Sequence, residues 1–173
     1  MSTIQFRKSL GPVLAAAVLL AIGVNIGGNS GVAAQSQPPV LGASGYHPTL
    51  GDLMNALIQP RHAKLGLAGA AGNWPLASYA LVEINQGFKS VGNAFPMWRR
   101  LSLPDMIDNL ITGPAKALDE AIKARDPVRF NAAYQDLTNA CNSCHTALQH
   151  GFVVIKVPDR SSFPNQNFDP VKK

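Results

Sequence analysis

The sequence predicts an all-α fold, an antiparallel four-helix bundle followed by an irregular C-terminal tail. Apolar residues recur at steps of three and four in four successive segments, and stretches rich in Pro, Gly and Asn separate these segments. Four long helices joined by short connections favour antiparallel packing of neighbouring helices. Before the tail, no segment has the alternating pattern that predicts a sheet.

The first 46 residues are predicted to precede the folded domain. Residues 1–34 have a basic start, an apolar run over Val13–Val24 and small residues ending at Ala34, which is the pattern of a cleaved signal peptide. Export to the periplasm follows from this prediction. An uncleaved inner-membrane anchor is the alternative, because Leu10–Ile26 carries no charge and approaches the length of a membrane span. Residues 35–46 are expected to form a flexible leader.

The domain predicted over 47–151 begins with two helices. The first helix covers about 48–71, and Pro60 inside it predicts a kink or a short break. The second helix begins after Asn73, a good N-cap, with Pro75 in its first turn. Its apolar face consists of Leu76, Ala80, Ile84, Phe88 and Val91.

The third and fourth helices have similar start signals. The third begins with a capping-box-like pattern at Ser102, and Gly113-Pro114 predicts a bend or an interruption. The fourth begins at Asp126-Pro127 and ends at Gly151, with residues 152–173 as an extended tail. Its buried face is the most regular in the chain: Phe130, Tyr134, Leu137, Cys141, Cys144 and Leu148.

The charge balance excludes a nucleic-acid-binding role. Removal of Arg7 and Lys8 with the signal peptide lowers the net charge from +5 to +3. No cluster of Lys and Arg alternates with aromatic residues, so the basic footprint of a nucleic-acid interface is missing from the sequence.

The chemistry of the chain is predicted from its only two cysteines, Cys141 and Cys144, and from His145 beside them. Together they form C-x-x-C-H, the attachment motif of c-type haem. Cysteines three residues apart lie on one face of a helix, so both thiols can add to the two vinyl groups of one porphyrin. His145 then supplies the proximal iron ligand. One covalently attached haem c is the predicted cofactor.

Other interpretations of the cysteines are weaker. A thioredoxin-like pair belongs at a helix start in a βαβ unit, and a structural zinc site needs more ligands. A disulfide between Cys141 and Cys144 would close a very small loop, with little benefit to stability.

The sixth iron ligand is predicted from helix direction. His145 lies about five residues before the end of the fourth helix, so its counterpart in an antiparallel first helix is Met54. His62 is the competing ligand, on nearly the same helical face but about 12 Å further along the axis. If neither binds, the iron is five-coordinate. Arg61 is a candidate contact for a haem propionate.

A haem motif at the end of the last of four helices in an exported chain resembles the class II cytochromes c, the cytochrome c prime group. The resemblance covers about 47–150 and depends on Cys141, Cys144 and His145. It implies haem binding, and it implies a homodimer as one possible assembly. That family usually has Arg or Lys four residues after the proximal His, where this chain has Gln149.

The predicted function is that of an exported monohaem c-type cytochrome, which moves single electrons between redox partner proteins of the periplasm or inner membrane. The alternative is a five-coordinate haem protein that binds nitric oxide or carbon monoxide, as members of the resembling family do. An enzyme such as a peroxidase ranks third. It would need a distal acid/base, for which only His62 beside Arg61 is available.

Overall fold

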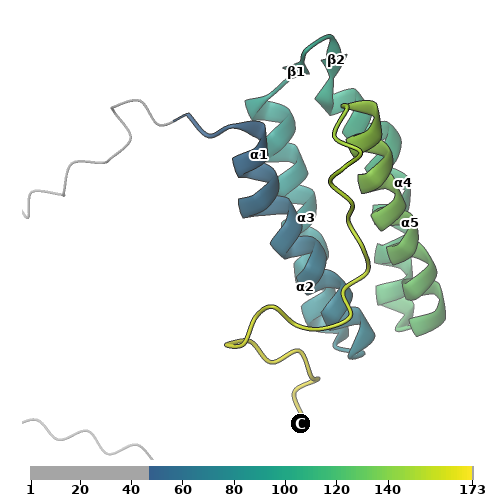
Figure 1. Cartoon of the computed structure of the whole chain (residues 1–173). Helices are drawn as coiled ribbons and strands as arrows, with labels where there is room; N and C mark the ends of the chain where they lie inside the picture. The colour runs from purple at the N-terminus through teal and green to yellow at the C-terminus, as the bar shows by residue number, and fades with distance from the viewer. Residues whose placement is uncertain (1–46, 173) are drawn as a thin grey trace, which may run out of the picture. The chain divides into compact units, whose positions relative to one another are not determined.

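The prediction of a mainly helical chain is confirmed by a computed structural model, which describes residues 47–172. The predicted signal peptide and leader, residues 1–46, lie outside the described residues. None of the helices within 47–172 is long and apolar enough to cross a membrane. The helical elements are α1 (Leu50–Leu53), the π-helical η1 (Met54–Ile58), α2 (Gln59–Ala70), α3 (Trp74–Ala94), α4 (Leu103–Ala124) and α5 (Pro127–Ala147) (Figure 1).

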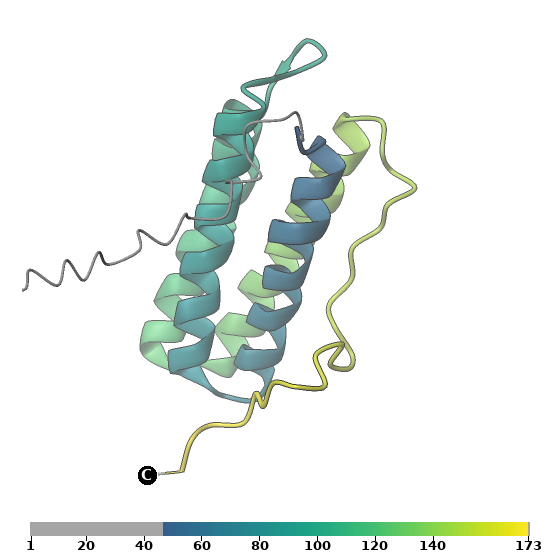
Figure 2. The ribbon, with the colours of Figure 1, turned by 90° about the vertical axis from the view of Figure 1, so that its left-hand side faces the viewer.

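The four long helices pack in a closed cycle of neighbours. α2 contacts α3, α3 contacts α4, α4 contacts α5, and α5 contacts α2 (Figure 2). The core lies between them and is apolar, as the helical spacing predicts. Its most fully buried large side chains are Leu65, Ile84, Val91, Leu118, Phe130 and Leu137, with Thr138 among them.

The predicted helix starts are confirmed. Asn73, Ser102 and Asp126 precede α3, α4 and α5, and a side-chain oxygen of each accepts a backbone N–H two or three residues later. These bonds satisfy N–H groups that a helix leaves without an internal partner. Short polar segments in the sequence therefore fix where three of the four long helices begin.

The predicted short break at Pro60 takes the form of a π turn, whereas α4 continues through Pro114 without the interruption that was the alternative to a bend. At Pro60 the helix continues, and the turn before it widens to π geometry, in which Gln59 N–H donates to Met54 O. Widening moves the preceding carbonyls away from the proline ring, which would otherwise clash with the carbonyl four residues earlier. α4 runs through Pro114 because Gly113, having no Cβ, avoids the usual clash between a proline and the residue before it.

A short hairpin joins α3 to α4, where no sheet was expected. β1 (Met97–Trp98) pairs antiparallel with β2 (Leu101–Ser102), with Met97 opposite Ser102. The two loop residues are arginines, and Arg99 has a left-handed backbone with φ of 55°. Such loops usually contain Gly or Asn, so the sequence lacked the ordinary hairpin signal.

The tail after α5 forms no helix or strand within the described residues, yet two asparagines hold it against the helices (Figure 1). The Asn142 side chain bonds both backbone groups of Ile155, at 2.9 Å to its oxygen and 2.8 Å from its nitrogen. Asn73 Nδ2 donates to the carbonyls of Phe168 and Asp169 at 3.1 and 3.0 Å. The tail therefore runs from the end of α5 to the start of α3.

We predict that Gly69→Ala destabilises the chain. A Cβ at Gly69 would lie 2.0 Å from the ring of Phe130, which is fully buried and has no room to move. We expect a loss of about 1–3 kcal/mol in the free energy of unfolding, measured by urea titration. Gly92→Ala is the matched control, because its Cβ meets Pro104 at an ordinary 3.5 Å. Gly92→Ala should raise the free energy of unfolding by up to ~1 kcal/mol, because Ala has a higher helix propensity than Gly. Equal stability of the two variants would contradict the prediction.

Candidate haem site

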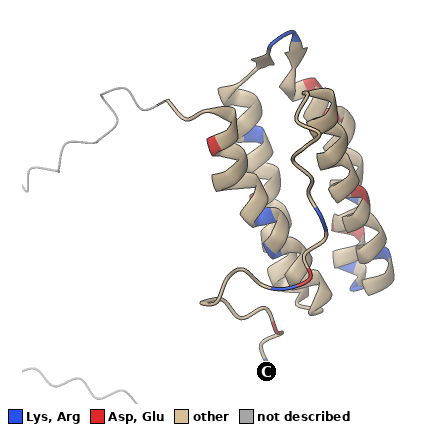
Figure 3. Ribbon diagram, viewed as in Figure 1, with Lys and Arg blue, Asp and Glu red and all other residues tan. Residues whose placement is uncertain are grey.

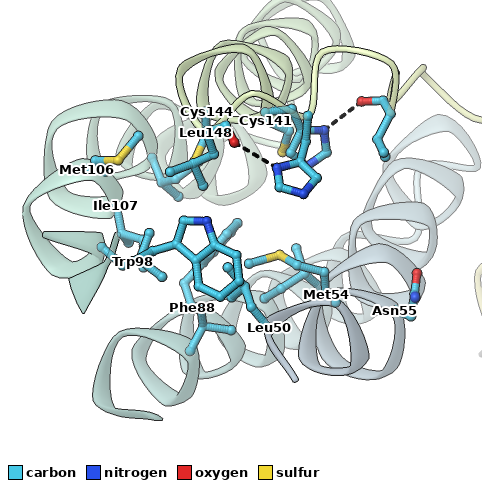
Figure 4. Close-up of a pocket in the computed structure, with 18 residues that line it drawn as sticks. Leu50, Met54, Asn55, Phe88, Trp98, Met106, Ile107, Cys141, Cys144 and Leu148 are labelled. Atoms are coloured by element: carbon cyan, nitrogen blue, oxygen red, sulfur yellow. Dashed lines mark hydrogen bonds between the residues drawn. The ribbon is translucent and has the colours of Figure 1, made fainter. Parts of the chain in front are cut away.

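A cavity of about 240 Å³ lies where the start of the first helical segment, the hairpin, the start of α4 and the end of α5 meet (Figure 4). Among the residues that line it, none is Lys, Arg, Asp or Glu. Charged residues occur elsewhere, for example in the hairpin loop and along the helices (Figure 3). The cavity is lined by Leu50, Gly51, Met54, Asn55, Ile58, Phe88, Val91, Trp98, Leu103, Met106, Ile107, Ile111, Cys141, Cys144, His145, Leu148, His150 and Val153.

Both cysteines of the motif line this cavity and are free thiols. Cys141 is buried, and burial, together with the neighbouring Cys144, raises its pKa to about 12. Burial also raises the pKa of Cys144. Both groups are therefore neutral thiols at physiological pH, whereas redox-active and metal-binding cysteines act as thiolates.

The imidazole of His145 is held in one tautomer. Its Nδ1 lies 2.7 Å from the carbonyl oxygen of Val153 in the tail. A carbonyl can only accept, so Nδ1 carries the proton and donates it. Nε2 of the neutral ring then has its lone pair free, which is the arrangement that a metal-ligating histidine needs.

Met54, the predicted sixth ligand, lines the same cavity as His145. Figure 4 shows its thioether on the wall that faces Cys141 and Cys144. Met54 is the first residue of η1, and π-helical turns are frequent at functional sites. The structure thus brings together four of the six residues predicted for the site.

His62 and Arg61 are the two predicted residues that lie outside this cavity. His62 is buried between α2 and α5, with Nε2 3.0 Å from Thr138 Oγ1 and Nδ1 3.0 Å from Tyr134 Oη. Tyr134 also donates to the backbone oxygen of His62 at 2.7 Å. Arg61 forms an ion pair with Glu83 of α3 at 3.3 Å.

Sequence reasoning missed four polar or sulfur-bearing residues that line the cavity, of which Asn55 belongs to η1. Met106 comes from α4, His150 follows α5 and Trp98 belongs to the hairpin. The Trp98 Nε1–H is buried, and among the described residues it has no hydrogen-bond partner. An unpaired buried N–H costs about 1–3 kcal/mol. Trp98 is therefore a donor suited to an acceptor on a bound group.

The hairpin is tied to the end of the motif-bearing helix. The guanidinium of Arg99 donates to Oε1 of Gln149. Gln149 itself has a left-handed backbone with φ of 63°, in the turn that follows α5. This contact holds one wall of the cavity against another. It also places the guanidinium of Arg99 beside Gln149, the position at which the cytochrome c prime group usually has Arg or Lys.

The described residues hold no metal site built from several protein side chains. Within 47–172, no three His, Cys, Asp or Glu side chains are placed to share an ion. Comparison with protein-family models, curated proteins and solved structures gives no match to this chain.

The burial of His62 predicts a pH-dependent stability. Desolvation lowers the pKa of His62 from 6.5 to about 4 in the folded chain. Above pH 6.5 both states are neutral and the full stability is present. Between pH 6.5 and 4 the unfolded chain binds a proton that the folded chain does not, so stability falls as the pH drops. The total loss is about 3 kcal/mol.

The measurement is the free energy of unfolding from pH 4 to pH 7.5 for the unchanged chain and for His62→Gln. Carboxylates titrate alike in the two proteins, so the difference between their two pH profiles is due to His62. The variant should lose the decline between pH 6.5 and 4. Parallel profiles would show that His62 does not cause it.

Proposed function

We propose that this chain is an exported monohaem c-type cytochrome that transfers single electrons, with its haem carried on an antiparallel four-helix bundle like that of the class II cytochromes c. One observation carries the proposal: Cys141, Cys144 and His145 line a single apolar cavity together with Met54. Cys141 and Cys144 would hold the haem through thioethers. His145 would bind the iron on one side and Met54 on the other.

The residues present fit a haem. Neither cysteine is in a disulfide, so each has the S–H that addition across a vinyl group consumes, and His145 presents a free Nε2. The orphaned Nε1–H of Trp98 fits an acceptor such as a propionate. Haem, when bound, supplies an iron that cycles between the ferric and ferrous states by one electron.

The chain's own residues would favour electron transfer over bond-breaking chemistry. The lining contains no carboxylate or amine within the described residues, and its two imidazoles are at the end of α5 and just after it. Each imidazole already uses Nδ1 on a backbone carbonyl, Val153 for His145 and Leu148 for His150. The apolar walls exclude water, which favours the less charged ferrous state. A thioether from Met54 would raise the potential further.

The covalent attachment is tested by expression of the full chain in a host that matures c-type cytochromes. We expect haem that stays with the polypeptide under denaturing conditions, and a shifted pyridine haemochrome spectrum when either Cys141→Ala or Cys144→Ala removes one thioether. Ser143→Ala is the matched control, because its hydroxyl bonds only Asn139 O of the same helix. Absence of covalent haem from the unchanged chain would refute the proposed function.

The sixth ligand is tested by Met54→Leu against Met106→Leu, since both thioethers line the cavity but on different helices. We expect Met54→Leu to abolish the weak red methionine-to-iron band of the oxidised protein, and Met106→Leu to retain it. A high-spin spectrum of the unchanged protein in both redox states, with direct carbon monoxide binding, would instead favour the five-coordinate gas-binding function.

A further inference from the structure

We propose that Asn142, inside the C-x-x-C-H motif, is a positioning residue that sets the reduction potential by holding the tail carbonyl that bonds His145. The proposal depends on the proposed haem function. It assigns a role to the tail, 152–173, and to a motif position that haem attachment leaves unspecified.

The geometry of α5 and the tail supports this role. Asn142 and His145 are three residues apart, so both project from the same face of the helix. Ile155 and Val153 are only two residues apart in a tail without helix or strand, so fixing the backbone of Ile155 restrains the nearby carbonyl of Val153. The amide of Asn142 bonds both the N–H and the C=O of Ile155, as a neighbouring strand would. This register brings Val153 O to 2.7 Å from His145 Nδ1.

Packing contributes little to the position of this part of the tail. Phe152 is 81% exposed and Val154 is 72% exposed, whereas Val153 is 42% exposed and lines the cavity. The turn after α5 restrains Val153 only through its N–H, which donates to His150 O at 2.8 Å. The two Asn142 bonds therefore add a polar link between α5 and this stretch, beside the contact of His145 with Val153 O itself.

The expected consequence is a lower reduction potential. A carbonyl that accepts from Nδ1–H makes Nε2 a more basic ligand, and such outer contacts change metal affinity by about 10–100-fold. A more basic ligand stabilises the ferric state more than the ferrous state. Loss of the Val153 contact should thus favour reduction by about tenfold, which equals a rise of ~59 mV for one electron.

The test compares Asn142→Ala, Asn142→Asp and Ser143→Ala in the full haem-loaded chain. Potentials are measured by redox titration, and the His145 Nδ1–H signal is followed by proton NMR of the reduced protein. Asn142→Ala should raise the potential by ~59 mV, the equivalent of a tenfold change in the equilibrium for one-electron reduction, and expose Nδ1–H to rapid exchange. Asn142→Asp keeps the acceptor for Ile155 N–H but loses the donor to Ile155 O. Its potential should therefore lie between that of the unchanged chain and that of Asn142→Ala. Ser143→Ala should match the unchanged chain.

Limited proteolysis of the tail separates positioning from simple anchoring. If Asn142→Ala speeds cleavage within 152–157 but leaves the potential and the Nδ1–H signal unchanged, Asn142 only anchors the tail and the proposal is overturned. Unchanged cleavage, potential and exchange overturn it as well. In either case covalent haem is present and the proposed function stands, whereas a chain without covalent haem refutes that function first.

Discussion

The site depends on the close approach of α2 to α5, which two glycines permit. A Cβ on Gly66 would lie 2.5 Å from Tyr134, and one on Gly69 would lie 2.0 Å from Phe130. Without them the aromatic face of α5 could not lie flat against α2. Because these contacts fix α2 along α5, they also fix the turn of Met54 relative to the turn of His145. The apolar cavity at the other end is thus a consequence of packing about three to four helical turns away.

The helices were predictable because their signals are local. Caps at Asn73 and Asp126 and the regular spacing in α5 depend on neighbours in sequence, and the structure has them as expected. That Met54 and His145 line one cavity was predictable from helix direction alone. The hairpin at Arg99 and the continuity through Pro60 were not predictable, because the first lacks a glycine signal and the second depends on a π turn.

The sequence also could not predict which side chains contact one another across helices. The sequence marks His62 as a histidine on the inner face of the first helix, which fits a ligand and a core residue equally. The structure places it against Tyr134 and Thr138, with both ring nitrogens in contact with hydroxyl groups. Likewise, nothing local to Asn142 indicates Ile155, because their contact depends on the path of a tail that has no regular structure.

The unpaired indole of Trp98 has a consequence for how the protein is assembled. The hairpin that carries it lines one side of the cavity, and within the described residues nothing accepts from this buried donor. Whatever satisfies that donor stabilises the closed hairpin by mass action. Under the proposed haem function, haem binding and the stability of the hairpin are therefore thermodynamically linked.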